Sequence, residues 1–316
     1  MKKVVSIDVG FGDVKVVYER AGNLVFKKFP TAIKEVLPTR IDFSTSSSEK
    51  EYYYNSRYYV IGENAKNNSL NQSTVNSLVE FTPLLIYKAI IDYQLETENT
   101  IFALGLPLYE YTQKNKQRLK AKLADFEVDY KKQGYFVHIY PQGVGCYFAY
   151  TLYHKQEIQN ALILDIGFNT VEIILLRNGR IVKTESTMLA KNGIMQIAGL
   201  LKRLLLERKK INLSYQEAID ILINKSITIY GKKFDLSDIV TEVKRMYSDQ
   251  LLKEIYAMYD DNLRSADRLL LCGGGAYHIG DHLPEEYNGL AEILPDAEFA
   301  NALGYYFALK YQLEKK

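Results

Sequence analysis

Two stretches of the chain decide the fold: residues 5–17 read VSIDVGFGDVKVV, and residues 162–174 read LILDIGFNTVEII. They align without a gap at an offset of 157 residues, which pairs Asp8 with Asp165. Two unrelated hairpins would both use glycine in their turns, but they would not share an aspartate, a glycine, a phenylalanine and a valine at one offset. The repeat therefore indicates that the chain is built from two related halves.

The repeat continues through a second turn, where residues 20–25 (RAGNLV) align with residues 177–182 (RNGRIV). Each copy predicts a short apolar strand, a tight glycine-containing turn, a second strand, another glycine turn and a third strand. A chain of 316 residues, 47% of them hydrophobic, is long enough for two such cores.

The first turn of each copy follows a strand that ends near an aspartate. Glycine lets the backbone turn sharply, and successive N–H groups that point into one concavity suit phosphate oxygens. Asp8 and Asp165 cannot hold phosphate, but they can share a Mg²⁺ ion through its waters, and the metal can bridge phosphate oxygens. Lys15 has the strand alternation to face the phosphates, and Asn169 and Thr170 can donate from the second side. The paired turns thus predict a polyphosphate site.

A third glycine cluster follows another apolar strand, in residues 268–276 (RLLLCGGGA). It lacks the lysine of a Walker A motif, and it does not have the glycine spacing of a dinucleotide-binding βαβ unit. Three consecutive glycines after a strand allow a flat ligand or another backbone to approach closely. A purely structural turn from strand to helix remains the alternative.

These three elements, in this order, resemble the actin-type nucleotide-binding superfamily, which includes actin, Hsp70-type ATPases and sugar kinases. Within it, the chain most resembles the prokaryotic actin-like proteins, meaning plasmid-segregating filaments of the ParM type and their archaeal relatives. Residues 58–65 (YYVIGENA), 104–107 (LGLP) and 299–306 (FANALGYY) also resemble that branch. The resemblance implies an α/β, actin-like fold: two duplicated lobes with mixed five-stranded sheets flanked by helices, and a nucleotide in the cleft between them.

The resemblance also implies the domain bounds and the binding residues. Domain I would comprise residues 1–145 with 302–316, and domain II residues 146–301. In the second loop, Phe168 and Asn169 stand where relatives commonly carry small residues. The residues expected to bind nucleotide are Gly10, Phe11, Gly12, Asp13 and Lys15 in the first loop, Gly167, Phe168, Asn169 and Thr170 in the second, Gly193 at a helix start near the ribose, and Gly273, Gly274, Gly275 and Ala276 in the adenosine motif.

The connector between the halves, residues 139–145 (IYPQGVG), carries Gln142. In the superfamily, this connector places a Gln or Glu beside the terminal phosphate, where it orients the attacking water. Glutamine is not a strong base, but it can orient a water through its amide, and phosphoryl transfer relies mainly on positioning. We therefore expect slow hydrolysis, with Gln142, Asp8 and Asp165 as the catalytic residues. A plain turn residue after Pro141 is the alternative for Gln142.

The resemblance implies an ATPase that binds Mg-ATP, or GTP in its place, and polymerises head to tail into nucleotide-dependent cytoskeletal filaments. Plasmid segregation is one task of such filaments, and there a DNA-binding adaptor protein would link the filament to DNA. The polar tract at residues 44–50 (STSSSEK) predicts a loop or hairpin tip of the kind that lies at subunit contacts in actin-like filaments.

Composition limits the other partners. The formal net charge of +2 argues against direct nucleic acid binding. No apolar stretch approaches the roughly 18 residues of a membrane span, so we expect no membrane partner. Two cysteines, Cys146 and Cys272, cannot form a disulfide framework and fit a reduced, cytoplasmic compartment.

A small-molecule kinase for sugars or short acids is the alternative function within the same superfamily. Such an enzyme normally needs a carboxylate base at the acceptor hydroxyl. The connector carries Gln142 instead, which favours the filament-forming ATPase.

Overall fold

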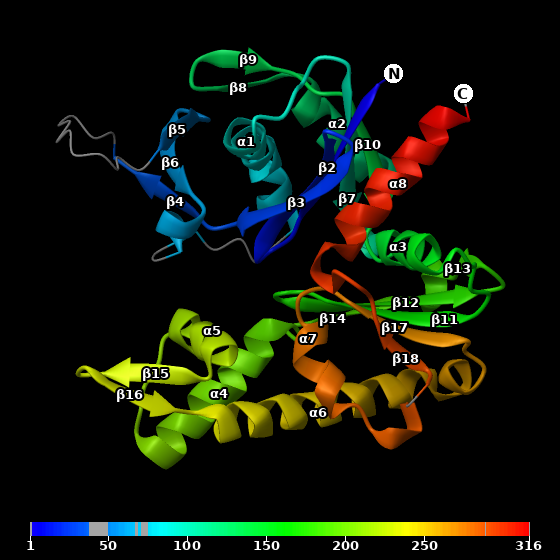
Figure 1. Cartoon of the computed structure of the whole chain (residues 1–316). Helices are drawn as coiled ribbons and strands as arrows, with labels where there is room; N and C mark the ends of the chain where they lie inside the picture. The colour runs from blue at the N-terminus through cyan, green and yellow to red at the C-terminus, as the bar shows by residue number, and fades with distance from the viewer. Residues whose placement is uncertain (1, 38–49, 67–68, 71–74, 288, 316) are drawn as a thin grey trace. The chain divides into compact units, whose positions relative to one another are not determined.

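The computed structural model describes residues 2–37, 50–66, 69–70, 75–287 and 289–315. The predicted loop tip at residues 44–50 lies, except for Lys50, outside the described residues. The chain divides into two compact units (Figure 1), of which unit 1 comprises Met1–Ala149 with Asn301–Lys316 and unit 2 comprises Tyr150–Ala300. The expected boundary after residue 145 differs from this division, because helix α3 (Val144–His154) continues across it without a break.

Unit 1 is built on a five-stranded sheet in the order β10-β7-β1-β2-β3. Strands β1, β2 and β3 are antiparallel neighbours, whereas β7 and β10 add as parallel strands. The expected mixed five-stranded sheet is therefore confirmed. The bounds are Lys3–Val9 for β1, Asp13–Arg20 for β2, Asn23–Pro30 for β3, Thr100–Leu106 for β7 and Val137–Pro141 for β10.

Strand alternation divides β1 between the two faces of this sheet. Val5, Ile7 and Val9 join the apolar core that helices α1 (Val75–Tyr93) and α2 (Gln113–Ala124) cover. Successive side chains of a strand point to opposite faces. The intervening Ser6 and Asp8 therefore lie on the other face, where they are nevertheless buried.

Helix α8 (Ala300–Glu314) packs against that second face. The ring of Tyr305 stacks on Tyr140 of β10 with centroids 5.7 Å apart, and a Cβ atom added to Gly105 of β7 would lie 2.6 Å from the Tyr305 hydroxyl. Glycine is thus needed at position 105 because the helix side chain occupies the space of a side chain there. The last helix of the chain is in this way built into unit 1 (Figure 1).

Unit 1 also contains smaller elements. The sequence from residue 109 to residue 124 predicts one helix, but α2 begins only at Gln113, because Thr112 caps it by accepting a hydrogen bond from the Asn115 N–H. Two cations of α2 contact α1: Arg118 donates to Asn76, and Lys122 pairs with Glu80. The remaining strands are β4 (Ile33–Val36), β5 (Glu51–Tyr54) and β6 (Arg57–Ile61) in one three-stranded sheet, and β8 (Phe126–Val128) with β9 (Lys131–Gln133) in a two-stranded one.

Unit 2 repeats the sheet of unit 1, in the order β13-β12-β11-β17-β18. As in unit 1, the first three strands of the repeat are antiparallel and the last two join in parallel, while β14 adds a further antiparallel pairing to β12. The expected duplication of the fold is confirmed by this topology. The bounds are Ala161–Ile166 for β11, Thr170–Arg177 for β12, Arg180–Ile181 for β13, Thr187–Ala190 for β14, Arg268–Cys272 for β17 and Ala291–Ile293 for β18.

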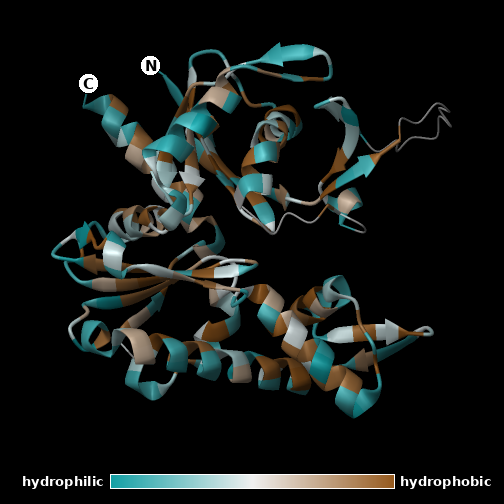
Figure 2. Cartoon of the chain, turned by 180° about the vertical axis from the view of Figure 1, so that it is seen from behind, coloured by the Kyte–Doolittle hydropathy of each residue, from teal (hydrophilic) through white to brown (hydrophobic). Residues whose placement is uncertain are grey.

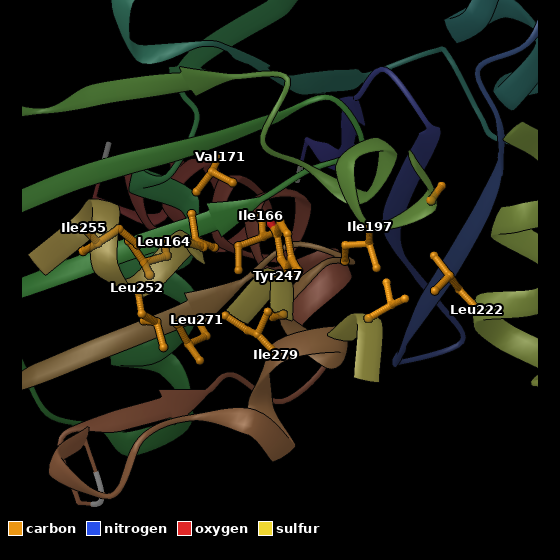
Figure 3. Close-up of a cluster of buried hydrophobic side chains, with 14 of the residues drawn as sticks. Leu164, Ile166, Val171, Ile197, Leu222, Tyr247, Leu252, Ile255, Leu271 and Ile279 are labelled. Carbon is orange, nitrogen blue, oxygen red and sulfur yellow. The ribbon is translucent and has the colours of Figure 1, made fainter. Parts of the chain in front are cut away.

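The core of unit 2 lies between this sheet and four helices (Figure 3). Leu164, Ile166 and Val171 of the sheet pack with Tyr247 and Ile255 of helix α6. Unit 2 also carries a two-stranded sheet of β15 (Ser226–Ile229) and β16 (Lys232–Asp235). The four helices are α4 (Ile194–Lys209), α5 (Tyr215–Asn224), α6 (Ser237–Arg264) and α7 (Ala276–Ile279).

Helix α6 alternates between hydrophilic and hydrophobic residues along its length (Figure 2). This is the pattern of a helix that buries one side against a core and leaves the other in water. Among the described residues, no helix is both long and apolar enough to cross a membrane.

Candidate functional site

The two glycine turns of the repeat close with the same backbone hydrogen bond. In unit 1, the Gly10 N–H donates to the Asp13 carbonyl over 3.1 Å, and in unit 2 the Gly167 N–H donates to the Thr170 carbonyl over 2.9 Å. The two bonds are equivalent, because the 157-residue offset of the repeat aligns Gly10 with Gly167 and Asp13 with Thr170. The aligned sequences therefore form one local structure twice.

Thr31, which follows β3, holds the first turn from outside. Its N–H donates to the Gly12 carbonyl over 2.9 Å, and its hydroxyl donates to the Gly10 carbonyl over 2.7 Å. The side chain of Thr31 is buried. With two carbonyls of the turn engaged in this way, the turn can present N–H groups to an anion, as a phosphate-binding nest requires. The sequence carries no signal that identifies Thr31.

Three polar side chains of unit 1 meet beside the first turn. Asp8 is only 4% exposed, and one of its carboxylate oxygens accepts a hydrogen bond of 3.1 Å from the Gln142 Nε2. The other lies 3.8 Å from the ammonium of Lys15, the residue directly opposite Asp8 in the β1–β2 ladder. A buried carboxylate needs such partners, because burial without them is costly. The structure thus brings together Asp8, Lys15 and Gln142, which lie far apart or on different strands in the sequence.

Helix α4 holds the second turn, and it does so with its first backbone N–H groups. Gly193, Ile194 and Met195 donate to the carbonyls of Asn169, Gly167 and Phe168, at 3.4, 3.1 and 3.0 Å. A helix leaves its first N–H groups without partners in the helix, and here the turn supplies them.

Gly193 is required at the start of α4 by close packing. A Cβ atom added there would lie 2.5 Å from the Gly167 carbonyl oxygen and 2.6 Å from that of Phe168, both backbone atoms. The sequence expectation for Gly193 was a contact with the ribose. The structure gives this residue a packing role against the second turn, and the ribose contact stays a prediction.

The third glycine cluster packs against the strand that carries Asp165. A Cβ atom on Gly273 would lie 2.6 Å from a carboxylate oxygen of Asp165, and one on Gly275 would lie 2.1 Å from the Ile166 side chain. Gly273 also has a φ of +78°, which favours glycine. Gly274 is different, because a Cβ atom there would make only an ordinary contact with Ile194, at 3.7 Å.

The glycine cluster therefore serves as a structural turn and also leaves one glycine free to approach a ligand. Gly273 and Gly275 are explained by packing within unit 2, whereas Gly274 has no such explanation and is the glycine best suited to approach a ligand. The expected adenosine contacts of the cluster, including that of Ala276 at the start of α7, stay predictions.

The repeat is not symmetric in charge. Glu172 occupies the position of Lys15, directly opposite Asp165 in the β11–β12 ladder, and it is 6% exposed. Sequence reasoning did not single out Glu172, although the 157-residue offset aligns it with Lys15. Unit 1 thus pairs its aspartate with a cation, whereas unit 2 places a second carboxylate across the ladder.

Two further expectations are refined by the structure. Phe11 of the first turn is partly buried and packs against the apolar core of unit 1. The sequence predicts that His278 is a surface histidine, but its side chain on α7 is largely buried, and this burial, with Lys244 contributing, lowers its pKa to about 4. The surface prediction is therefore only partly right, because the residue is intermediate in exposure.

No group of three or more His, Cys, Asp or Glu side chains that could hold a metal ion occurs within the described residues. Mg²⁺ does not require such a group, because it keeps several waters and commonly binds one or two carboxylates together with substrate phosphates. Asp8 in unit 1 and Asp165 in unit 2 each stand beside a glycine turn, and each carboxylate is of the kind that holds Mg²⁺ through its waters.

Comparisons with known proteins cover both units. The family model for the N-terminal domain of actin-like proteins matches residues 6–145, and the model for the C-terminal domain of archaeal MreB-like actin homologues matches residues 163–285. A comparison with curated proteins returned no match.

Several solved structures have the same fold. An archaeal actin homologue aligns with a TM-score of 0.79 and 20% identity over 98% of this chain and 99% of that one. The same archaeal protein in complex with ADP gives a TM-score of 0.76 and 19% identity, again over 98% and 99%. A ParM from Clostridium botulinum, solved as a 15-stranded filament, gives 0.75 and 19% over 98% and 99%.

Proposed function

Since the chain belongs to the prokaryotic actin-like proteins, we propose that it binds and hydrolyses ATP, with GTP as the alternative nucleotide, and that it assembles head to tail into filaments. The observation that carries this proposal is the pair of equivalent turns, each closed by the same glycine hydrogen bond and each preceded by an aspartate. One polyphosphate would engage both turns.

The chain would hold the phosphates mainly with its backbone. Thr31 in unit 1 and the start of α4 in unit 2 engage the carbonyls of the turns. Apart from Gly10 and Gly167, whose N–H groups close the turns, the N–H groups of the turns are then the polar groups left for phosphate oxygens. Lys15 adds a cation beside the first turn, already held in place by Asp8. Neither turn needs a broad basic surface, in agreement with the net charge of +2.

Gln142 would orient the attacking water. Its Nε2 donates to Asp8, and within the described part of the chain its Oε1 accepts no hydrogen bond, so Oε1 can accept one from a water. Mg²⁺, when bound, would supply charge compensation for the phosphates, with Asp8 and Asp165 holding it through its waters. An amide held in this way positions a nucleophile but does not deprotonate it, so turnover would be slow.

The amide at position 142 also distinguishes this function from a small-molecule kinase. A kinase of the superfamily would use a carboxylate to accept the proton of the acceptor hydroxyl. The Asp8 carboxylate is already engaged by Gln142 and Lys15. The arrangement therefore supports hydrolysis over transfer to a sugar or acid.

Filament assembly rests on the family and on the relative that was solved as a filament. A single heterologous contact, repeated without closure, produces such a polymer. Nucleotide hydrolysis would bias that contact and so regulate the polymer. We further propose a cytoplasmic cytoskeletal role, for which plasmid segregation through a DNA-binding adaptor is one task to test.

The proposal is tested by measuring nucleotide binding, phosphate release and ATP-dependent sedimentation of the full chain with Mg²⁺. Lys15→Met removes a charge-assisted contact to phosphate and should weaken ATP binding by about tenfold or more. Asp165→Asn should slow phosphate release by at least about tenfold. The matched control is Lys27→Met on the neighbouring strand β3, where the side chain is exposed, and it should change neither quantity.

Three results would contradict the proposal. A chain that stays monomeric at high concentration with Mg-ATP would refute filament assembly. Unchanged turnover in Asp165→Asn would refute the role of that aspartate. ATP-dependent phosphorylation of a sugar or short acid would favour the kinase instead.

A further inference from the structure

The backbone on both sides of Gln142 is held by hydrogen bonds from different parts of unit 1. The Gln142 N–H donates to the Leu106 carbonyl at the end of β7, over 2.7 Å. The next residue, Gly143, has a φ of +75°, and its N–H donates to the Oδ1 atom of Asn301 over 2.8 Å. The direction in which the Gln142 side chain leaves the backbone is therefore determined by β7 on one side and by Asn301 on the other.

Asn301 lies in α8, 158 residues away from Gly143 in the sequence. It is only 6% exposed, and its Oδ1 also accepts a weak contact of 3.7 Å from the thiol of Cys146. A buried polar side chain is retained at a cost unless its hydrogen bonds are made. Here those bonds serve the connector that carries Gln142.

Close packing at two glycines, Gly145 and Gly304, keeps Asn301 within hydrogen-bond distance of the Gly143 N–H. A Cβ atom on Gly145 would lie 2.6 Å from the Asn301 Cα, and one on Gly304 would lie 1.9 Å from the Gly145 carbonyl oxygen. The backbones of α3 and α8 are thus in direct contact next to the hydrogen bond. This contact leaves the Asn301 side chain little freedom to move away from Gly143.

We propose that Asn301 is a positioning residue for nucleotide hydrolysis, acting through Gln142. The proposal rests on the hydrolytic function proposed above. Without the Asn301 acceptor, the Gly143 N–H is left buried without its partner, and the connector must rotate to satisfy it. That rotation moves the Gln142 amide away from Asp8 and from the water that it orients. A misplacement of about 1 Å can cost on the order of a hundredfold in rate.

The test compares kcat for phosphate release with the nucleotide dissociation constant. Asn301→Ala should lower kcat by about tenfold to a hundredfold, while the dissociation constant changes by less than about threefold, because the turns and Lys15 are untouched. Asn301→Asp keeps an acceptor for Gly143 and should restore kcat to within about threefold of the unmodified chain. If the alanine variant does not fold, Asn301→Ser should give the same loss, because the shorter hydroxyl does not reach Gly143.

A double-mutant cycle with Gln142→Ala shows whether Asn301 acts through Gln142. In the Gln142→Ala background, Asn301→Ala should cause no further loss of kcat. The matched control is Tyr306→Phe, which removes a 3.0 Å hydrogen bond to Glu19 from the same helix α8 and should leave kcat unchanged.

Two outcomes separate this inference from the function on which it rests. Absence of hydrolysis in the unmodified chain would overturn the proposed function and the role of Asn301 with it. Hydrolysis that is insensitive to Asn301→Ala, or a loss of equal size with and without Gln142, would overturn the role of Asn301 alone.

Discussion

The first turns of the two halves have the same closing hydrogen bond but are supported by different neighbours. In unit 1, one buried threonine, Thr31, engages two carbonyls of the turn. In unit 2, the N–H groups of the N-cap Gly193 and of the first two residues of α4 engage three carbonyls, with Gly193 in backbone contact with the turn. The charges differ as well, since Lys15 faces Asp8 whereas Glu172 faces Asp165.

The comparison separates what the repeat specifies from what its surroundings add. Local sequence specifies the turn and its closing bond, because both depend on residues within four positions of one another. The supports come from segments outside the aligned repeat, so each half could acquire its own. Unit 1 accordingly carries the side-chain chemistry of the site, namely Lys15 and Gln142, whereas unit 2 carries most of its close glycine packing.

The largest effect is expected where the second turn meets α4. Gly193→Ala would force a Cβ atom to within 2.5 Å of a backbone oxygen, which the turn cannot accommodate without losing hydrogen bonds to α4. We expect the free energy of unfolding to fall by about 3 kcal/mol, as measured by urea or thermal unfolding.

The matched control for this change is Gly199→Ala on the same helix. There the nearest atom to an added Cβ would be the Tyr215 hydroxyl, at 3.8 Å, which is an ordinary contact. Alanine also favours a helix, so stability should rise by about 0.5–1 kcal/mol. Equal effects at positions 193 and 199 would contradict the packing role of Gly193.

A lower pH should have an intermediate effect on the free energy of unfolding, through His278 of unit 2. The pKa of His278 is lowered to about 4, so the native state holds this imidazole neutral while the unfolded chain protonates it near pH 6.5. The stability that it contributes is present above pH 6.5 and is lost as the pH falls toward 4, by about 2 kcal/mol at pH 5.

Unfolding measured from pH 7 to pH 5 checks this prediction. His278→Leu should flatten the pH dependence, whereas His282→Gln should retain it because His278 is still present. A wild-type pH dependence in His278→Leu would show that other groups control acid unfolding.

The smallest effect is expected at the first turn. Thr31→Val keeps the volume of the side chain but removes the hydroxyl donor to the Gly10 carbonyl. A loss of about 1 kcal/mol is expected, with amide exchange in the first turn faster by roughly fivefold and exchange in the second turn unchanged. Hydrogen exchange read separately for the two turns is the measurement, and Thr31→Ser should restore protection. Faster exchange in both turns would mean that their supports are not independent.

Sequence reasoning was most successful where the evidence was local. The apolar run at residues 100–106 (TIFALGL) predicts a buried strand, and the structure forms β7 over Thr100–Leu106. The later start of α2 depended on the cap at Thr112, and the burial of His278 depended on packing around α7. Neither can be read from hydrophobic periodicity alone.

In the candidate site too, the sequence identifies individual residues, whereas the contacts between them are seen only in the structure. Sequence named Asp8, Lys15 and Gln142 one by one, and the structure joins them through two contacts to Asp8. Asn301 lies in a stretch that resembles relatives, yet nothing in that resemblance indicates its hydrogen bond to Gly143. A contact between residues 158 positions apart leaves no periodic trace in the sequence.

By itself, the sequence determined that the protein is a duplicated α/β chain with two aspartate–glycine turns, because repeats and turn chemistry depend on neighbouring residues. Only the tertiary structure decided how those turns are held and which side chains meet beside them. Thr31, the start of α4 and Asn301 act through buried hydrogen bonds to backbone groups. Any residue offers the same backbone groups, so such contacts become visible only when the chain has folded.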